Sequence, residues 1–433
     1  MKTLNSAALK SSTTSVALLD LRRQYDSLRE EVLAAIARVC DSQGFILGPE
    51  VEALEREISA LTGAAAAVGC ASGTEALWLA LVAAGVKPGD SVITTAFSFF
   101  TSASAIVRAG ATPILVDVDP GTLNLDPKLV EEKLRAEFAR KGTASARSAY
   151  SGTGSGANDE GRCEGTIRAI LPVHLYGQCA DMDAFSRVAE EFGVAIVEDA
   201  AQAIGATWRG RGAGSLGATA AFSFYPTKNL SAYGDAGIVT TTNIEMAEHM
   251  RRLRNHGSPR RYYHDEFGWN GRMDAIQAAV LRVKLPHIGE WNEARRRHAV
   301  TYDRLFGESG LTSSAVSSAQ SGLGANATAS ASTAPVRLLG RAPEATHVFH
   351  QYVIRARRRD DLRRFLAERK IGTEIYYPLP LHLQPVFSYL GLKEGDLPVA
   401  EQAAKEVLAL PMFPELTEDE IRCVVESIAE FYS

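Results

Sequence analysis

Short apolar runs alternate with longer stretches of helical periodicity from residue 63 onward. Short buried strands that alternate with amphipathic helices are the pattern of βα units, which build a largely parallel sheet covered by helices on both faces. The sequence therefore predicts an α/β fold in which ligands bind at the carboxyl ends of the strands. The predicted strands span 66–69, 91–95, 113–118, 168–173 and 194–198, and the predicted helices among them span 75–84 and about 185–192.

The pattern changes on either side of this region. Apolar residues recur at helical spacing from Leu28 to Val39, which predicts an amphipathic first helix that ends near Gly44. Beyond Pro286, short strands mix with a basic amphipathic stretch at 359–369 and two closing helices, which is typical of a smaller α+β domain. We therefore predict a large domain over residues 15–285 and a small C-terminal domain over residues 286–433.

Two segments interrupt the pattern, at about 141–164 and about 312–335. Both are rich in Ser, Ala and Gly and contain hardly any bulky apolar residue. Such a composition buries too little apolar surface to offset the entropy lost on ordering. We predict that both segments are surface insertions outside the catalytic fold, and the sequence assigns no function to either.

Composition and charge exclude several classes of function. The chain has 433 residues and a net charge of −5, with Lys and Arg scattered, so no basic footprint for nucleic acid is present. The five cysteines stand far apart, with no His at zinc-ligand spacing, so reduced thiols and no metal site are expected. No apolar run approaches the roughly 18 residues that a membrane span needs. We expect a cytoplasmic protein without a membrane partner.

The strongest candidate chemistry lies between residues 194 and 235. Asp199 follows a buried-strand signal, and Lys228 follows a second strand-like run at 220–225. A lysine just past a buried strand can have a depressed pKa and form a Schiff base, and Ser223 is near enough to help hold a phosphate. Taken singly, a strand-end Asp is usually a cap and a loop Lys is usually a solvated charge. The order of these residues favours a functional site.

A second cluster of small residues, 69–74, directly precedes a predicted helix. Small residues let backbone amides approach an anion closely, and the helix N-terminus adds unpaired donors, so a phosphate would fit there. An ordinary capped turn has the same spacing and is the more common interpretation when this signal is taken alone. The aromatic run 97–100 could stack on a flat cofactor, although such a run is more often part of a core.

Several longer motifs make the chain resemble the DegT/StrS sugar aminotransferases. The resemblance covers about residues 19–431 except the two Ser/Ala/Gly-rich segments, and the motifs occur in the family's order. They are SGTEAL at 72–77, FSFFTSASA at 97–105, PVHLYGQCADMD at 172–183, EDAAQAIGA at 198–206, FSFYPTKNLSAYGDAG at 222–237, RNHG at 254–257, GWNGRMDAIQAA at 268–279 and EIYYPLPLHLQPVF at 374–387.

The resemblance implies a fold-type-I pyridoxal-phosphate enzyme, normally a homodimer with its active sites at the subunit interface. Lys228 matches the family's Schiff-base lysine, which also moves the proton, and Asp199 matches the carboxylate that keeps the pyridine nitrogen protonated. The remaining matches are implied contacts: Gln202 with the phenolic oxygen, Gly73, Thr74 and Ser223 with the phosphate, Phe99 with the ring face, Asn270 with the phosphate of the neighbouring subunit, and Arg272, Tyr376, Tyr377 and His382 with substrate.

The same resemblance implies transamination of a nucleotide-linked keto-deoxysugar in amino-sugar and polysaccharide biosynthesis, with an amino acid, expected to be L-glutamate, as donor. Two of the motifs are more similar to members that aminate C3 than to those that aminate C4. Family dehydratases replace the reactive lysine by His, so Lys228 favours transamination. The alternatives are a 4-keto sugar aminotransferase, a dehydratase, and a non-catalytic regulator that binds sugar or cofactor. Where many relatives have His-Tyr-Pro, this chain has Tyr376-Tyr377-Pro378, which leaves the contacts of Tyr376 open.

Overall fold

The computed structural model describes residues 15–148, 166–312 and 334–433. Most of each predicted insertion, 149–164 and 313–333, lies outside these ranges. The start of the first one differs from the prediction, because helix α5 (Pro127–Ser148) continues through residues 141–148. These residues include no proline, the residue that ends a helix most sharply.

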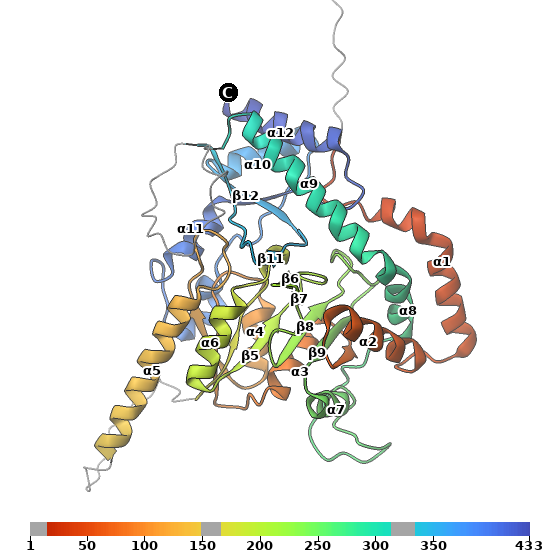
Figure 1. The fold of residues 1–433 in the computed structure, drawn as a ribbon, viewed down its shortest axis with the longest axis vertical. Coiled ribbons are helices and arrows are strands. Elements are labelled where there is room, and N and C mark those ends of the chain that lie inside the picture. The colour runs from red at the N-terminus through yellow and green to blue at the C-terminus, as the bar shows by residue number, and fades with distance from the viewer. Residues whose placement is uncertain (1–14, 149–165, 313–333) are drawn as a thin grey trace, which may run out of the picture.

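A seven-stranded sheet forms the centre of the N-terminal part (Figure 1). Its strand order is β1-β9-β8-β5-β4-β2-β3, and all neighbours are parallel except the two pairs that involve β9. This sheet confirms the predicted α/β class with a mostly parallel sheet. The strands are β1 (Ala66–Cys70), β2 (Ser91–Thr95), β3 (Thr112–Val116), β4 (Ile167–Leu171), β5 (Ala195–Asp199), β8 (Thr219–Ser223) and β9 (Gly237–Thr241).

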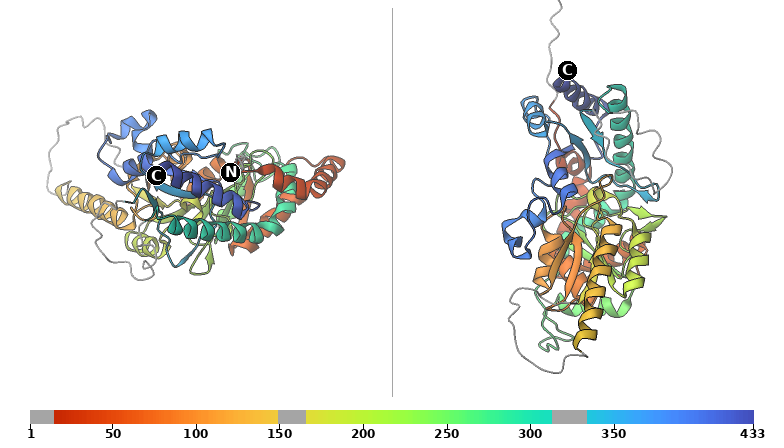
Figure 2. Two further views of the ribbon diagram at one scale, coloured as in Figure 1. Left: turned by 90° about the horizontal axis from the view of Figure 1, so that it is seen from above. Right: turned by 90° about the vertical axis from the view of Figure 1, so that its left-hand side faces the viewer.

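Helices cover both faces of this sheet because its strands are apolar on both sides. Successive side chains of a strand point to opposite faces. Ile196 and Phe222 therefore pack into the core that includes α2, α5 and α6, whereas Val197 and Ala221 pack into the core that includes α3, α4 and α7. Figure 2 shows the yellow α5 beside the yellow-green α6. The helices are α1 (Leu21–Ser42), α2 (Pro49–Thr62), α3 (Gly73–Ala83), α4 (Thr101–Arg108), α6 (Met182–Phe192), α7 (Ile244–Leu253) and α8 (Ala275–Lys284).

The C-terminal part has its own antiparallel sheet, in the order β10-β12-β13, and an apolar core that also includes residues of the N-terminal part, such as Phe97 and Leu175. The long helix α9 runs from the neighbourhood of α8 to that of α12 (Figure 1). The elements are α9 (Ile288–Glu308), β10 (Val336–Leu338), β12 (Tyr352–Ala356), α10 (Arg359–Glu368), α11 (Pro398–Glu406), β13 (Val407–Leu410) and α12 (Glu418–Tyr432), and a third small sheet contains β6 (Thr207–Trp208), β7 (Arg211–Gly212) and β11 (Ala345–Thr346).

The predicted domain boundary near residue 286 falls in the 3-10 turn Leu285–His287 between α8 and α9. The first described residues pack with the C-terminal part, because Val16 forms a parallel bridge with Ile371 and its side chain lies in the C-terminal core. The division into two domains stays a prediction. Within the described ranges, no helix combines the length and the hydropathy that crossing a bilayer requires.

Candidate active site

Lys228 and Asp199 reach one place because their strands are neighbours. Asp199 is the last residue of β5, which pairs in parallel with β8 so that Asp199 lies opposite Ala221. Lys228 follows β8 in a loop that is closed by a hydrogen bond from the Lys228 amide to the Tyr225 carbonyl at 2.8 Å. Each of the two charged groups shifts the pKa of the other toward the charged form, so the two side chains share one pocket.

The amine of Lys228 has the properties of a reactive group. Within the described chain it has no hydrogen-bond acceptor and no ion-pair partner. Burial lowers the pKa of Lys228 to about 8, and the nearby carboxylate of Asp199 opposes that shift without cancelling it. A substantial fraction of the amine is therefore neutral near physiological pH, which is the state that attacks a carbonyl carbon.

A hydroxyl group that the sequence analysis did not single out holds the carboxylate of Asp199. Ser102, in the first turn of α4, donates from Oγ to Asp199 Oδ2 at 2.7 Å, and the amide of Ala201 donates to Oδ1 at 3.2 Å. The Oγ atoms of Ser98 and Ser102 are 2.9 Å apart. Burial raises the pKa of Asp199, whereas the hydrogen bond from Ser102 lowers it, so this hydroxyl favours the ionised carboxylate.

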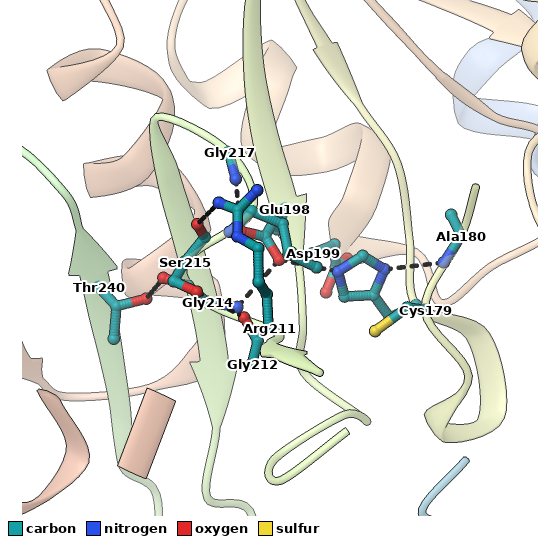
Figure 3. Close-up of polar contacts among 12 residues, drawn as sticks. Cys179, Ala180, Glu198, Asp199, Arg211, Gly212, Gly214, Ser215, Gly217 and Thr240 are labelled. Carbon is teal, nitrogen blue, oxygen red and sulfur yellow. Dashed lines mark hydrogen bonds and ion pairs between the residues drawn. The ribbon is translucent and has the colours of Figure 1, made fainter. Parts of the chain in front are cut away.

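Glu198, the neighbour of Asp199 on β5, anchors the strand end from the other face (Figure 3). It is fully buried, and its carboxylate accepts hydrogen bonds from the amides of Gly214, Leu216 and Gly217 at 2.8–2.9 Å. Nε2 of His174 lies 2.9 Å from the same carboxylate, and Nδ1 of His174 accepts from the Ala180 amide at 3.2 Å, so Nε2 carries the proton. This network fixes the backbone from which Asp199 extends.

Gln202 connects the strand end to the C-terminal part of the chain. Its Oε1 accepts from the Tyr176 amide at 2.6 Å, and its Nε2 donates to the hydroxyl of Tyr377 at 3.1 Å. The ring of Phe99, which is 58% exposed, lies 6.2 Å from the ring of Tyr377 between centroids. The structure therefore brings together Gln202, Phe99 and Tyr377, which are far apart in sequence.

The start of helix α3 forms a cradle beside the end of β8. Ser72 caps the helix by accepting from the Glu75 amide at 3.2 Å, which leaves the amides of Gly73 and Thr74 without an acceptor among the described residues. A Cβ atom on Gly73 would lie only 2.6 Å from Cβ of Ser223, so glycine is required for this approach. Two free amides, a helix N-terminus and the Ser223 hydroxyl fit a phosphate group.

The residues in this pocket fit pyridoxal phosphate. Its aldehyde requires an amine with a lowered pKa, which is Lys228. Its ring nitrogen requires a carboxylate, which is held on the adjacent strand, and its phosphate requires an anion cradle. The exposed face of Phe99 is apolar and available for stacking on a flat ring.

Asn270 and Arg272 lie beside this cradle on the segment between α7 and α8. Arg272 forms a backbone bridge with Cys70 at the end of β1, and its Nη1 donates to Asn255 Oδ1 at 3.1 Å. Its Nε is buried without an acceptor in the described structure. Asn270 is exposed on this single chain.

The side chains of Tyr376 and Tyr377 reach the surface, whereas that of His382 does not. Tyr376 and Tyr377 are both partly exposed, and Tyr377 contacts Gln202. His382 was expected to contact substrate, but its side chain is fully buried and its Nε2 lies 3.0 Å from Oε1 of Glu401 on α11. The structure corrects this expectation, because a buried side chain paired with a carboxylate stabilises the local fold and is out of reach of a ligand.

The contact between Ser102 and Asp199 leads to a test. Ser102→Ala is expected to lower kcat/KM about 10- to 100-fold, because a hydrogen bond to a charged group contributes about 1.5–3 kcal/mol. Loss of this donor also raises the pKa of Asp199, so the acid limb of the pH profile of kcat/KM should move to higher pH. Ser102→Thr keeps the hydroxyl and should retain the original limb. An unshifted limb in the alanine variant would contradict the assignment.

Comparison with known proteins identifies the family. The model of the DegT/DnrJ/EryC1/StrS aminotransferase family matches residues 26–429. The chain is 47% identical to the pleiotropic regulatory protein of Geobacillus stearothermophilus, over 96% of this chain and 99% of that protein. It is 40% identical to the dTDP-3-amino-3,4,6-trideoxy-alpha-D-glucose transaminase of Streptomyces venezuelae, over 98% and 97% of the two chains.

Solved structures agree with this result. The structure of S. venezuelae DesV in complex with a ketimine intermediate has a TM-score of 0.82 and 39% sequence identity, and the match covers 96% of this chain and 98% of that one. The chain therefore belongs to the DegT/DnrJ/EryC1/StrS aminotransferase family and is a pyridoxal-phosphate-dependent transaminase.

Proposed function

We propose that the enzyme transfers an amino group from L-glutamate to C3 of a nucleotide-linked keto-deoxysugar, in amino-sugar and polysaccharide biosynthesis, and that it acts in the cytoplasm. The observation that carries the proposal is the amine of Lys228, without an internal partner and with a pKa of about 8, in one pocket with Asp199. The amination of C3 is supported by the motifs at 72–77 and 374–387 and by the similarity to the S. venezuelae relative, a dTDP-3-amino-3,4,6-trideoxy-alpha-D-glucose transaminase.

Each residue of the pocket has a separate role in this reaction. Asp199 would keep the ring nitrogen protonated, Gln202 would contact the phenolic oxygen, and Phe99 would stack on the ring. Gly73, Thr74 and Ser223 would hold the phosphate. When bound, the cofactor supplies an electron sink for the negative charge that develops at the reacting carbon.

Lys228 serves both halves of the reaction. Lys228 would hold the cofactor through its amine and would be released when the amino-acid donor binds. The freed, neutral Lys228 then accepts the proton from the donor's α-carbon. In the second half Lys228 returns a proton to the sugar carbon that gains the amine. A pKa of about 8 suits a group that accepts and donates protons near neutral pH.

Arg272, Tyr376 and Tyr377 complete the site on the substrate side. Arg272 lies beside the phosphate cradle, and a guanidinium in this place suits an acidic group of the nucleotide sugar. The two tyrosines offer hydroxyl groups to the sugar ring.

The active enzyme is proposed to be a homodimer that shares its active sites. The segment before Asn270 presents four aromatic side chains to solvent, which are exposed by 43–90%. Large exposed apolar patches on soluble proteins mark interaction surfaces. A second copy that covers this patch would carry Asn270 to the phosphate of its partner. The four residues are Tyr262, Tyr263, Phe267 and Trp269.

Complementation of two variants tests this sharing. Lys228→Ala and Asn270→Ala should each be impaired as a homodimer. A mixed dimer, purified through two different tags, should recover about half of the wild-type rate, because one of its two sites receives both native residues. No recovery in the mixed dimer would show that Asn270 does not act across subunits.

A glutamate half-reaction tests the function itself. Protein loaded with pyridoxal phosphate is incubated with L-glutamate, and release of 2-oxoglutarate and loss of the visible absorbance of the lysine-bound cofactor are measured. The pyridoxamine form is then screened by mass spectrometry against nucleotide-linked 3-keto and 4-keto sugars. Amination of the 4-keto sugar alone would refute the assignment to C3, and a deoxygenated product without amine would indicate a dehydratase.

A second candidate is a regulator that binds sugar or cofactor without turnover. The relative from Geobacillus stearothermophilus is named a pleiotropic regulatory protein, which favours this candidate. The free amine of Lys228 argues against it, because binding alone does not need a nucleophile. Failure to produce the corresponding keto acid from any of the common amino acids would support the regulator.

A further inference from the structure

We propose that Arg108, the last residue of α4, is a positioning residue for the phosphate of the cofactor, because it holds and neutralises the carboxylate of Glu75 beside the phosphate cradle. This inference rests on the proposed contacts of the phosphate with Gly73, Thr74 and Ser223. It adds a pair of residues outside those contacts that sets the charge which the phosphate meets.

Glu75 places a negative charge at the start of α3. It is the third residue of the helix and directly follows the two free amides of the cradle, those of Gly73 and Thr74. A Cβ atom on Gly271 would lie 3.2 Å from Oε2 of Glu75, so the carboxylate packs against the segment that contains Asn270. A carboxylate in this turn and a phosphate at the same helix end repel each other.

The charge of Glu75 acts on the base of the cradle. Burial is the main reason why the pKa of the Cys70 thiol is raised, and the negative charge of Glu75 adds to this shift. Cys70 ends β1, and its Sγ lies 3.4 Å from the carbonyl oxygen of Ser72, the cap residue of α3. A charge that acts on Cys70 also acts on a phosphate bound at the amides that follow Ser72.

Arg108 is the counter-ion of Glu75. Its Nη1 donates to Oε1 at 2.5 Å and its Nη2 donates to Oε2 at 3.0 Å, so the guanidinium occupies both oxygens. Within the described ranges, no other cation lies at ion-pair distance from Glu75. The side chains of Arg108 and Glu75 are 28% and 19% exposed, so solvent screens their attraction only in part.

The carboxylate of Glu75 does not close the end of its own helix. Ser72 and Glu75 have the spacing of a capping box, in which the glutamate accepts from the amide of the cap residue. On α12 the same spacing forms a complete box, because Glu420 accepts from the Thr417 amide at 2.8 Å although it also forms an ion pair. On α3 only the half that Ser72 supplies is formed. The start of α3 therefore stays open for another anion while Arg108 holds Glu75.

Two tryptophan rings fix the position of the guanidinium. Cζ of Arg108 lies 4.8 Å from the centre of the Trp78 ring, and this ring stacks on that of Trp269 with 5.5 Å between centroids and 10° between planes. Trp78 is buried on α3, one turn after Glu75. A guanidinium that is both stacked and bidentate is held in one orientation. Because Trp269 precedes Asn270, the stack joins the ion pair to the segment that borders the cradle.

The affinities for pyridoxal phosphate and for pyridoxal, which lacks the phosphate, test this role. Each compound is titrated into the full chain freed of cofactor, and the absorbance of the lysine-bound compound is measured. Arg108→Gln should weaken the binding of pyridoxal phosphate about 10-fold and leave that of pyridoxal unchanged, because only the phosphate meets the unpaired charge of Glu75. Added salt should reduce this loss by screening the repulsion. The double variant with Arg108→Gln and Glu75→Gln should regain the wild-type affinity.

Arg341→Gln is the matched control. Arg341 donates to both carboxylate oxygens of Asp303 at 2.5 and 2.9 Å and lies 4.8 Å from the centre of the Phe349 ring, so it repeats the arrangement of Arg108 in another part of the chain. Its replacement should leave both affinities unchanged. Equal weakening of both compounds by Arg108→Gln, without recovery in the double variant, would show that Arg108 supports only the fold and would overturn the inference.

These affinities do not depend on turnover, so the inference and the proposed function can fail separately. If wild-type protein forms a keto acid from glutamate but Arg108→Gln binds pyridoxal phosphate as tightly as wild type, the inference is overturned and the proposed function stands. If the affinities change as expected but no amino acid yields a keto acid, the role of Arg108 stands and the proposed function fails.

Discussion

Lys228→Ala is expected to reduce turnover by about 10⁴-fold or more, because it removes both the covalent attachment of the cofactor and the base of both half-reactions. The variant should still bind pyridoxal phosphate through the remaining residues of the pocket. Borohydride reduction followed by mass spectrometry of peptides checks the attachment. Wild-type protein should carry the cofactor on the peptide that contains Lys228, and the variant should carry none.

The lowered pKa of Lys228 adds a pH dependence to this prediction. Above a pKa of about 8 the amine is neutral, so the rate at which added cofactor attaches should rise as the pH increases through about 8. An unperturbed lysine would show this rise near its ordinary pKa of 10.5. A rise only at the higher pH would contradict the lowered pKa of Lys228.

Lys284 is the matched control for Lys228. Burial lowers the pKa of Lys284 to about 8 as well, yet its amine donates to the carbonyl and the hydroxyl of Ser231, both at 2.9 Å. Lys284→Met should therefore leave the borohydride label on Lys228. If Lys284→Met folds normally by circular dichroism but loses the label, the assignment of Lys228 as the reactive amine is contradicted.

The sequence was sufficient to predict that Lys228 and Asp199 lie in one pocket, because local signals mark both. Each follows a buried apolar run, and a parallel sheet collects such strand ends at one edge. The small residues before α3 were visible as a candidate phosphate cradle, but an ordinary capped turn has the same spacing, and only the approach of Gly73 to Ser223 in the structure favours the cradle. These signals depend on neighbours in the chain.

Ser102 and His382 show why other features could not be predicted in the same way. Ser102 reaches Asp199 although its preceding strand β2 is separated from β5 by β4, and a sequence does not state the order of strands. His382 stands in a matching motif, but a motif does not reveal whether a side chain faces the pocket or a buried carboxylate. Contacts between distant elements, such as that of Gln202 with Tyr377, likewise require the folded structure.

Asp199→Asn is expected to lower the rate of both half-reactions about 10²- to 10⁴-fold, since breaking a buried charge pair costs about 3–5 kcal/mol. Asparagine has nearly the same shape and can still accept from Ser102, so the change removes the charge and little else. The amide cannot hold the ring nitrogen of the cofactor protonated, and the electron sink is weakened in consequence. Rapid-mixing absorbance measurements with L-glutamate would report the first half-reaction directly.

Asp117→Asn separates this loss of charge from a general loss of stability. Asp117 is also buried, and its carboxylate accepts from the amides of Val399 and Ala400 at 2.8 Å, at the start of α11. Its replacement should reduce thermal stability, because it weakens a charge-assisted cap, and should leave the rate per folded molecule unchanged. If Asp199→Asn reacts with glutamate as fast as Asp117→Asn, then the carboxylate on β5 does not control the charge of the cofactor.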